Sequence, residues 1–111
     1  MDETWRRRVE AELHRAERAR EDGQEAKARV CARRAAGWSL QPYYHERTGF
    51  VPPANALELL RWFQTDEAAP LHLRHAAQRL TIRVTVGFRL PHVEDPLEDA
   101  RRIVEAYTQR A

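Results

Sequence analysis

The sequence predicts an all-α protein, an antiparallel up-and-down bundle of about five helices, and three observations support this prediction. Apolar residues recur at intervals of three and four along most of the chain, the spacing that places side chains on one face of a helix. Cap residues, glycines and prolines divide this pattern into short stretches. The connections between the stretches are mostly short, and helices joined in this way pack as antiparallel neighbours.

The length and the composition fit one soluble domain that comprises residues 1–111. A domain commonly has about 100 to 150 residues, and 42% hydrophobic with 32% charged residues describes a globular chain with a highly charged surface. The 19 cations exceed the 17 anions by too little to indicate a nucleic-acid-binding protein. The N-terminus is charged and no apolar run approaches the roughly 20 residues of a membrane span, so we expect a cytoplasmic protein without membrane contact.

The first helix is predicted over residues 3–21. Its apolar stripe follows helical spacing and consists of Trp5, Val9, Leu13, Ala16 and Ala19. Asp22 and Gly23 end this helix, because glycine adopts the left-handed conformation that closes a helix. We therefore expect a tight helical hairpin at this point.

The second helix, over residues 24–40, is predicted to be the central one and carries small residues on its buried face. That face consists of Ala28, Cys31, Ala32, Ala35 and Trp38. Small side chains let the backbones of neighbouring helices approach closely. Since Cys31 shares the stripe, we interpret it as a buried core thiol and not as a nucleophile.

Pro42 must end or kink the second helix, because proline lacks an amide hydrogen. The segment that follows, residues 41–53, is predicted to be a connection. A third helix starts near Asn55, which together with Glu58 has the spacing of a capping box. Its buried face consists of Ala56, Leu59, Leu60 and Phe63, with Trp62 on the flank.

A fourth helix is predicted to begin at Pro70, because proline suits the first turn of a helix. Its apolar positions continue at helical spacing to residue 88. Residues 82–86, IRVTV, also show the β-branched alternation of a strand. We interpret them as helix, since a lone strand would have no partner elsewhere in the chain.

The last helix has a well-formed start signal. Asp95 is a cap residue, Pro96 occupies the first helical position, and Glu98 follows at the third. The predicted apolar face consists of Leu97, Ala100, Ile103, Val104 and Tyr107.

One cluster of arginine, tyrosine and histidine residues predicts a ligand site. It comprises Arg29, Arg33, Arg34, Tyr43, Tyr44 and His45. Arginine pairs with phosphate and aromatic rings stack on bases, so the cluster predicts a nucleotide-like ligand. In the alternative interpretation, the arginines pair with surface carboxylates and the tyrosines pack on the end of the bundle.

Other kinds of site are disfavoured by residue spacing. His72 and His75 lie three residues apart but offer only two ligands, and no further ligand is placed to complete a zinc site, so we expect no metal. The four glycines lack the spacing of a phosphate-binding loop, and we expect no cofactor. A helix-turn-helix DNA reader over residues 55–86 would bring the acidic turn TDEAAP towards phosphate, so DNA binding is not expected.

The order of elements resembles the HEPN family, the higher eukaryotes and prokaryotes nucleotide-binding domains. The matching features are Trp5 and HRAERA in the first helix, the turn at Asp22 and Gly23, and the segments ARVCARRAAGW, YYHERTGF and ALELLRWF. The resemblance implies an up-and-down bundle that is frequently a homodimer. It also implies a role as the partner of a small nucleotidyltransferase, and some members of the family are RNases.

The RNases of that family carry an arginine and a histidine a short interval apart near the start of a late helix. Here Arg7 and Arg8 have the required spacing relative to His14, but all three fall in the first helix. No catalytic residue is therefore carried over. We expect a non-enzymatic module that binds a partner protein or a nucleotide-like ligand; the alternatives are a metal-independent ribonuclease that uses Arg8 and His14, and a scaffolding homodimer.

Overall fold

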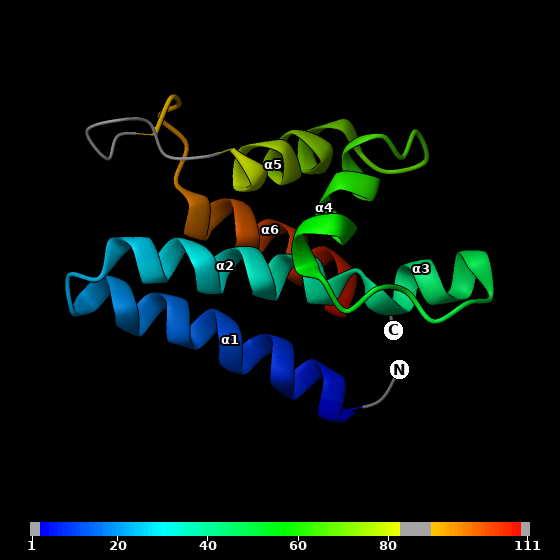
Figure 1. Ribbon diagram of the computed structural model, residues 1–111, viewed down its shortest axis with the longest axis horizontal. Coiled ribbons are helices and arrows are strands. Elements are labelled where there is room, and N and C mark those ends of the chain that lie inside the picture. The colour runs from blue at the N-terminus through cyan, green and yellow to red at the C-terminus, as the bar shows by residue number, and fades with distance from the viewer. Residues whose placement is uncertain (1–2, 83–89, 110–111) are drawn as a thin grey trace.

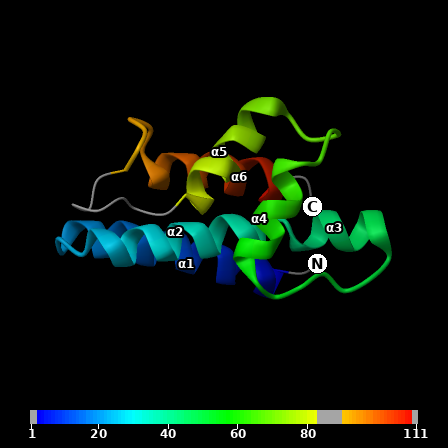
Figure 2. The same cartoon turned by 45° about the horizontal axis from the view of Figure 1, so that its top comes forward.

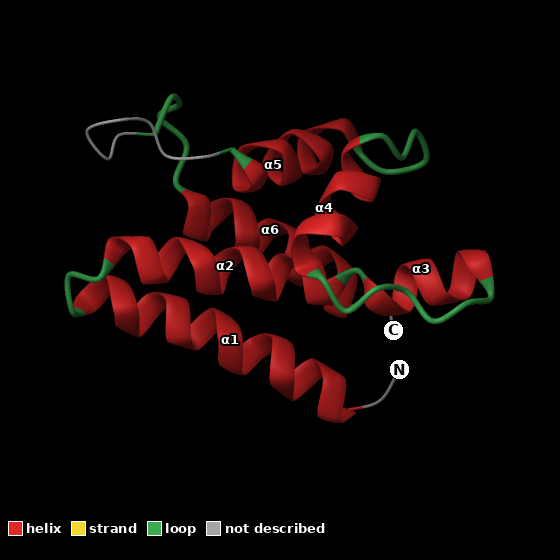
Figure 3. Ribbon diagram, viewed as in Figure 1, coloured by secondary structure: helices red, strands yellow, loops and turns green. Residues whose placement is uncertain are grey.

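The computed structural model describes residues 3–82 and 90–109, and it is all-helical over these ranges, as predicted (Figure 3). The helices are α1 (Glu3–Glu21), α2 (Glu25–Ser39), α3 (Gln41–Thr48), α4 (Ala56–Gln64), α5 (Leu71–Thr81) and α6 (Pro96–Thr108). None of the helices in the described ranges combines the length and the apolar composition that a membrane crossing needs.

Helix α2 is the centre of the bundle, because it contacts each of the other five helices. Two antiparallel pairs, α1 with α2 and α5 with α6, lie on either side of the contact between α2 and α6 (Figure 1). Helices α2 and α6 run in the same direction, α4 crosses α2, and α3 extends beyond the end of α2 (Figure 2). The main core contains the small residues of α2 and the larger apolar residues of α4, α5 and α6.

The predicted hairpin between α1 and α2 is confirmed. Gly23 has φ of +75°, the left-handed conformation that favours glycine. The amide of Gly23 donates to the carbonyl of Arg20, and that of Gln24 donates to Ala19, so the last carbonyls of α1 are satisfied. The turn brings the apolar stripe of α1 onto the small-residue face of α2, where Ala28, Cys31, Ala32 and Ala35 are buried.

The predicted connection over residues 41–53 is wrong in its first part, because Gln41–Thr48 forms α3. Pro42 ends α2 as expected, but its fixed φ also suits the first turn of a new helix. The chain stays helical through Leu40, the residue shared by the end of α2 and the start of α3. Gly49, with φ of +75°, then closes α3. One proline therefore both ends a helix and starts the next.

The predicted helix starts at Asn55 and Asp95 are confirmed. The side chain of Asn55 accepts from the amides of Leu57 and Glu58, and that of Asp95 accepts from the amide of Leu97. The predicted continuation of the fourth helix is wrong at Ile82, which caps α5 in an extended conformation. Residues 83–88 of that prediction, and so most of the IRVTV stretch, lie outside the described residues.

Candidate anion-binding site

In the structure, the six predicted ligand residues lie in three different environments. Arg29 and Arg33 line one cavity, at the face of α2 that looks towards the end of α5 and the start of α6. Arg34 points towards α1. The aromatic residues Tyr43 and Tyr44, with His45, belong to α3 beyond the end of α2. The cluster that is continuous in sequence is therefore not one site in space.

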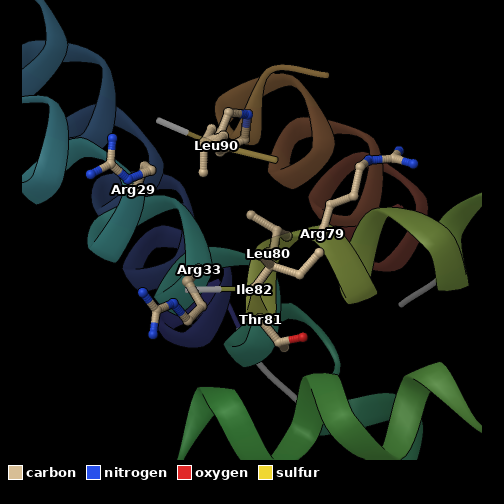
Figure 4. A pocket seen from close by; sticks show the side chains of 8 residues that line it. Arg29, Arg33, Arg79, Leu80, Thr81, Ile82 and Leu90 are labelled. Atoms are coloured by element: carbon tan, nitrogen blue, oxygen red, sulfur yellow. The ribbon is translucent and has the colours of Figure 1, made fainter. Parts of the chain in front are cut away.

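The cavity at Arg29 and Arg33 has a volume of about 190 Å³. The two arginines are four residues apart, so they project from neighbouring turns of α2 on the same side (Figure 4). The opposite wall comes from the end of α5 and the chain that leads into α6. Among the described residues, the lining consists of Arg29, Arg33, Arg79, Leu80, Thr81, Ile82, Leu90 and Pro96.

Within the described part of the chain, Arg33 carries an unpaired, half-buried charge. Its Nε is buried and has no hydrogen-bond partner. Neither Arg33 nor Arg29 belongs to any ion pair or hydrogen bond of the described residues. Burial lowers the pKa of Arg33, and the neighbouring charges of Arg29 and Arg34 lower it further. The cavity thus concentrates positive charge that nothing in the described chain balances.

The third arginine of the cavity is already engaged. Arg79 donates from Nε and from one terminal nitrogen to the two carboxylate oxygens of Asp99, at 2.9 and 2.8 Å. Asp99 is completely buried on α6, and this bidentate pair fixes α5 against α6. Figure 4 shows the Arg79 side chain directed away from Arg29 and Arg33. Arg79 therefore contributes its aliphatic stem to the cavity and its charge to Asp99.

The wall that faces the two free arginines is mainly apolar. Leu80 and Pro96 are buried, while Ile82 and Leu90 keep part of their surface accessible. The hydroxyl of Thr81 donates to the backbone carbonyl of Gln78 and accepts from the side-chain Nε2 of Gln64, so its hydrogen is already used. Two cations on one side and an apolar wall on the other suit an anion that is attached to an apolar or aromatic group.

Arg34 pairs with a carboxylate of α1. Its guanidinium lies 3.9 Å from Oε1 of Glu12, whose side chain is only 5% exposed. The other oxygen of Glu12 accepts from Arg15 at 3.4 Å. Arg34 follows Arg33 directly in sequence and lines a second hollow together with it, but Arg34 does not line the cavity.

The tyrosines of α3 converge on one aspartate. The hydroxyls of Tyr43 and Tyr44 donate to the same oxygen of Asp66, at 3.2 and 3.0 Å, and Arg47 pairs with that oxygen as well. The ring of Tyr43 packs edge-on against Tyr107 of α6. The tyrosines therefore fasten α3 to the end of the bundle, and His45 beside them is exposed.

Hydrogen bonding at Asp66 shifts the pKa values of the groups around it. Burial alone would raise the pKa of Asp66, but the bonds from Arg47, Tyr44 and the amide of Ala68 outweigh it, and the net pKa is lowered. Burial raises the pKa of Tyr44, and the bond to the Asp66 carboxylate raises it further. At neutral pH this group is a neutral phenol bound to a carboxylate, which is a structural arrangement.

The remaining candidate residues of the sequence are also accounted for. Cys31 is buried, as predicted, and burial followed by a contact with Glu12 raises the pKa of its thiol. His72 and His75 are exposed on α5. In the described part of the chain, no group of three or more histidine, cysteine, aspartate or glutamate residues is arranged to hold a metal ion.

The residues of the ribonuclease alternative have separate neighbours. The guanidinium of Arg8 lies 4.3 Å from the ring centroid of Trp38, on the side of α1 that faces α2. His14 is exposed, and its Nδ1 lies 3.6 Å from a carboxylate oxygen of Glu17 on the same helix. Arg8 and His14 therefore do not face a common point.

The sequence did not predict the apolar wall of the cavity. The predicted cluster included Arg29 and Arg33 of the central helix, but the end of α5 reaches them only through the packing of the whole bundle. No family model, curated protein sequence or solved structure matches the chain. The function is therefore inferred from the geometry of the cavity and the chemistry of its lining.

Proposed function

We propose that this protein is a non-catalytic binding module whose ligand is a nucleotide-like molecule with its phosphate on Arg29 and Arg33. The observation that carries the proposal is the unpaired charge of Arg33, with a buried Nε beside a second unpaired arginine. A half-buried charge without a partner is costly, and an anion placed between the two guanidinium groups would remove that cost. Guanidinium groups bind phosphate oxygens with paired hydrogen bonds, so a phosphate suits this position.

The rest of the ligand would lie on the apolar wall. Leu80, Ile82 and Leu90 offer carbon surface opposite the arginines, which suits the face of a sugar or a base better than a second charged group. An inorganic anion could contact the arginines but would leave this wall uncovered. We therefore expect a nucleotide to bind more tightly than inorganic phosphate.

The resemblance to the HEPN family adds two expectations about partners. It implies a homodimer and a small nucleotidyltransferase as a partner protein. Light scattering on a sizing column measures the first directly. Purification together with a nucleotidyltransferase encoded beside the gene tests the second. A monomer that binds nucleotide would leave the ligand proposal standing and would remove the expectation of a homodimer.

The ligand proposal is tested by removing the charge of Arg33 while its aliphatic stem is kept, in Arg33→Met. We expect nucleotide affinity, measured by calorimetry, to fall by at least about tenfold, since a hydrogen bond to a charged group contributes about 1.5–3 kcal/mol. We also expect the ligand-free variant to melt a few degrees higher than the wild type, because a shift of about 1 kcal/mol corresponds to about 4 °C in a chain of this size. The matched control is Arg61→Met on α4, an exposed arginine outside the cavity.

Two results would contradict this proposal. One is the absence of heat for all nucleoside mono-, di- and triphosphates with the wild-type protein. The other is an equal loss of affinity in Arg61→Met, which would mean that the ligand responds to overall charge and not to the cavity.

A further inference from the structure

A separate basic surface follows the contact between α1 and α2. Its members, which we call the basic face, are all exposed cations: Arg8, Arg15 and Arg18 of α1, with Lys27 and Arg34 of α2. Arg8 and Arg15 are seven residues apart and Arg18 follows three later, so the three lie along one side of α1. Neither arginine that carries the proposed nucleotide site belongs to this set.

Contacts across the two helices bring these cations together near the hairpin. Arg15, Arg18 and Lys27 line one hollow beside the α1–α2 turn. Asp22 also lines it, so three cations face one carboxylate there. Positive charge therefore prevails at this end of the basic face.

A buried carboxylate orients the middle of the basic face. Glu12 receives a hydrogen bond from Arg15 through Oε2, and its Oε1 lies 3.9 Å from Arg34. The Glu12 side chain is 5% exposed, whereas each arginine side chain remains 50% exposed. The buried carboxylate thus orients two guanidinium groups from their core side and leaves their outer nitrogen atoms accessible to a ligand.

The far end of the basic face carries a stacked pair. The guanidinium of Arg8 lies over the ring of Trp38 at 4.3 Å from its centroid. Trp38, Arg34 and also Arg33 line a second hollow, which continues to the start of α4 at Ala56. A planar guanidinium held on an indole presents a flat surface on which an unpaired base can stack.

Charge is segregated on α1, and this separates the basic face from the rest of the surface. Glu3, Glu10 and Glu17 repeat at intervals of seven on another side of the helix. Glu17 is turned towards α6, where it pairs with Arg101. The local charge of the basic face therefore greatly exceeds what the overall excess of two positive charges would indicate.

We propose that the basic face binds single-stranded nucleic acid through its phosphate backbone. From Arg8 to Arg18 the cations extend along about 15 Å of α1, at about 1.5 Å per residue, enough for several consecutive phosphates. Such binding combines a track of cations with stacking surfaces, and Arg8 on Trp38 supplies the latter. Val30 is the one exposed large apolar residue beside these cations in the described chain, so the face has little to insert into a membrane.

The proposal is tested by fluorescence anisotropy with a labelled oligouridine of about 20 nucleotides at about 50 and 200 mM salt. The test variant is Arg18→Ser with Lys27→Ser, both exposed. The control changes the net charge by the same two units at one exposed arginine of another helix, in Arg61→Glu on α4. We expect the test variant to bind about tenfold more weakly and its salt slope to fall by about 1.4, or about 0.7 for each lost phosphate contact. The control should stay within about twofold of the wild type.

This proposal does not rest on the nucleotide cavity, and the two can fail separately. Arg29→Met, at the cavity arginine that does not line the hollow beside Trp38, should keep its oligouridine affinity even though it loses the mononucleotide. Equal losses in the test and control variants, or no binding at the lower salt, would overturn the proposal. Polyglutamate or anionic vesicles that compete as well as the oligouridine would also overturn it, in favour of an acidic protein or a membrane surface respectively.

Discussion

At the scale of single residues, the arginines of α2 show what local spacing can and cannot predict. Arg29 and Arg33 are four apart, which places both on one side of a helix, and the structure holds them in one cavity. Arg34 belonged to the same predicted cluster, but its partner is Glu12 of α1. A partner on another helix cannot be read from the spacing within one helix, and the same holds for the tyrosines that bind Asp66.

Gly37 is a residue whose role follows from a close approach of two helices. A Cβ built at Gly37 would lie 2.5 Å from both Cα and Cβ of Ala56, the first residue of α4. In a free helix, replacing glycine by alanine stabilises by about 1 kcal/mol. Here we expect Gly37→Ala to destabilise the protein by about 1–3 kcal/mol, because α4 must move away from α2. Urea denaturation measures both the sign and the size of the effect.

A second substitution identifies which contact makes Gly37→Ala destabilising. Gly37→Ala combined with Ala56→Gly removes the clash with Cβ of Ala56 but leaves the contacts with its Cα and carbonyl oxygen. The double variant should therefore recover only part of the lost stability. A stabilised Gly37→Ala single variant would show that α2 and α4 do not approach as closely as described.

At the scale of helices, the capped starts of α4 and α6 were predictable, whereas the start of α3 and the end of α5 were not. Cap residues act locally, so Asn55 and Asp95 indicated the starts of α4 and α6 correctly. Pro42 was recognised as the end of α2, but the same proline also begins α3, because its fixed φ fits both situations. The end of α5 at Thr81 has no strong sequence signal, since the apolar period continues past the point where Ile82 turns extended.

Asp95 joins α1 to α6 and should make two separable contributions to the free energy of unfolding. Its side chain caps α6 at the amide of Leu97 and accepts two bonds from Arg20, at 2.7 and 2.8 Å, which tie α6 to the end of α1. We expect Asp95→Ala to lose about 1–2 kcal/mol, the cap together with a partly exposed ion pair. Asp95→Asn keeps a cap residue and should lose less than about 1 kcal/mol. Equal losses in the two variants, measured by urea denaturation, would mean that the cap contributes nothing.

At the scale of the whole molecule, two aspartates fasten opposite ends of the bundle. Asp95 holds the end near the α1–α2 turn, and Asp66, between α4 and α5, holds α3 at the other end (Figure 1). The sequence predicted the all-α class because helical periodicity is present in nearly every segment. It could not predict these ties, since Arg20 and Asp95 are 75 residues apart along the chain.

The hydrogen bonds and ion pairs of Asp95 and Asp66 make the stability of the whole protein sensitive to acid pH. Bonds from Arg20 lower the pKa of Asp95, and bonds from Arg47 and Tyr44 outweigh burial and lower that of Asp66. The folded protein therefore takes up protons less readily than the unfolded chain, in which an aspartate has a pKa of about 3.9. The resulting stabilisation is complete above that pH and is lost as the pH falls through the lower pKa values of the folded state.

We therefore expect the free energy of unfolding to be nearly constant from about pH 7 to pH 5 and to fall below about pH 4, where aspartates become protonated. Asp66→Asn with Asp95→Asn should be less stable at pH 7, by roughly 2 kcal/mol, because charged partners lose their carboxylates. The same variant should lose less stability on acidification, since two groups that resist protonation are gone. Urea denaturation at a series of pH values tests this, and an acid-induced loss as steep as in the wild-type protein would assign the acid sensitivity to other carboxylates.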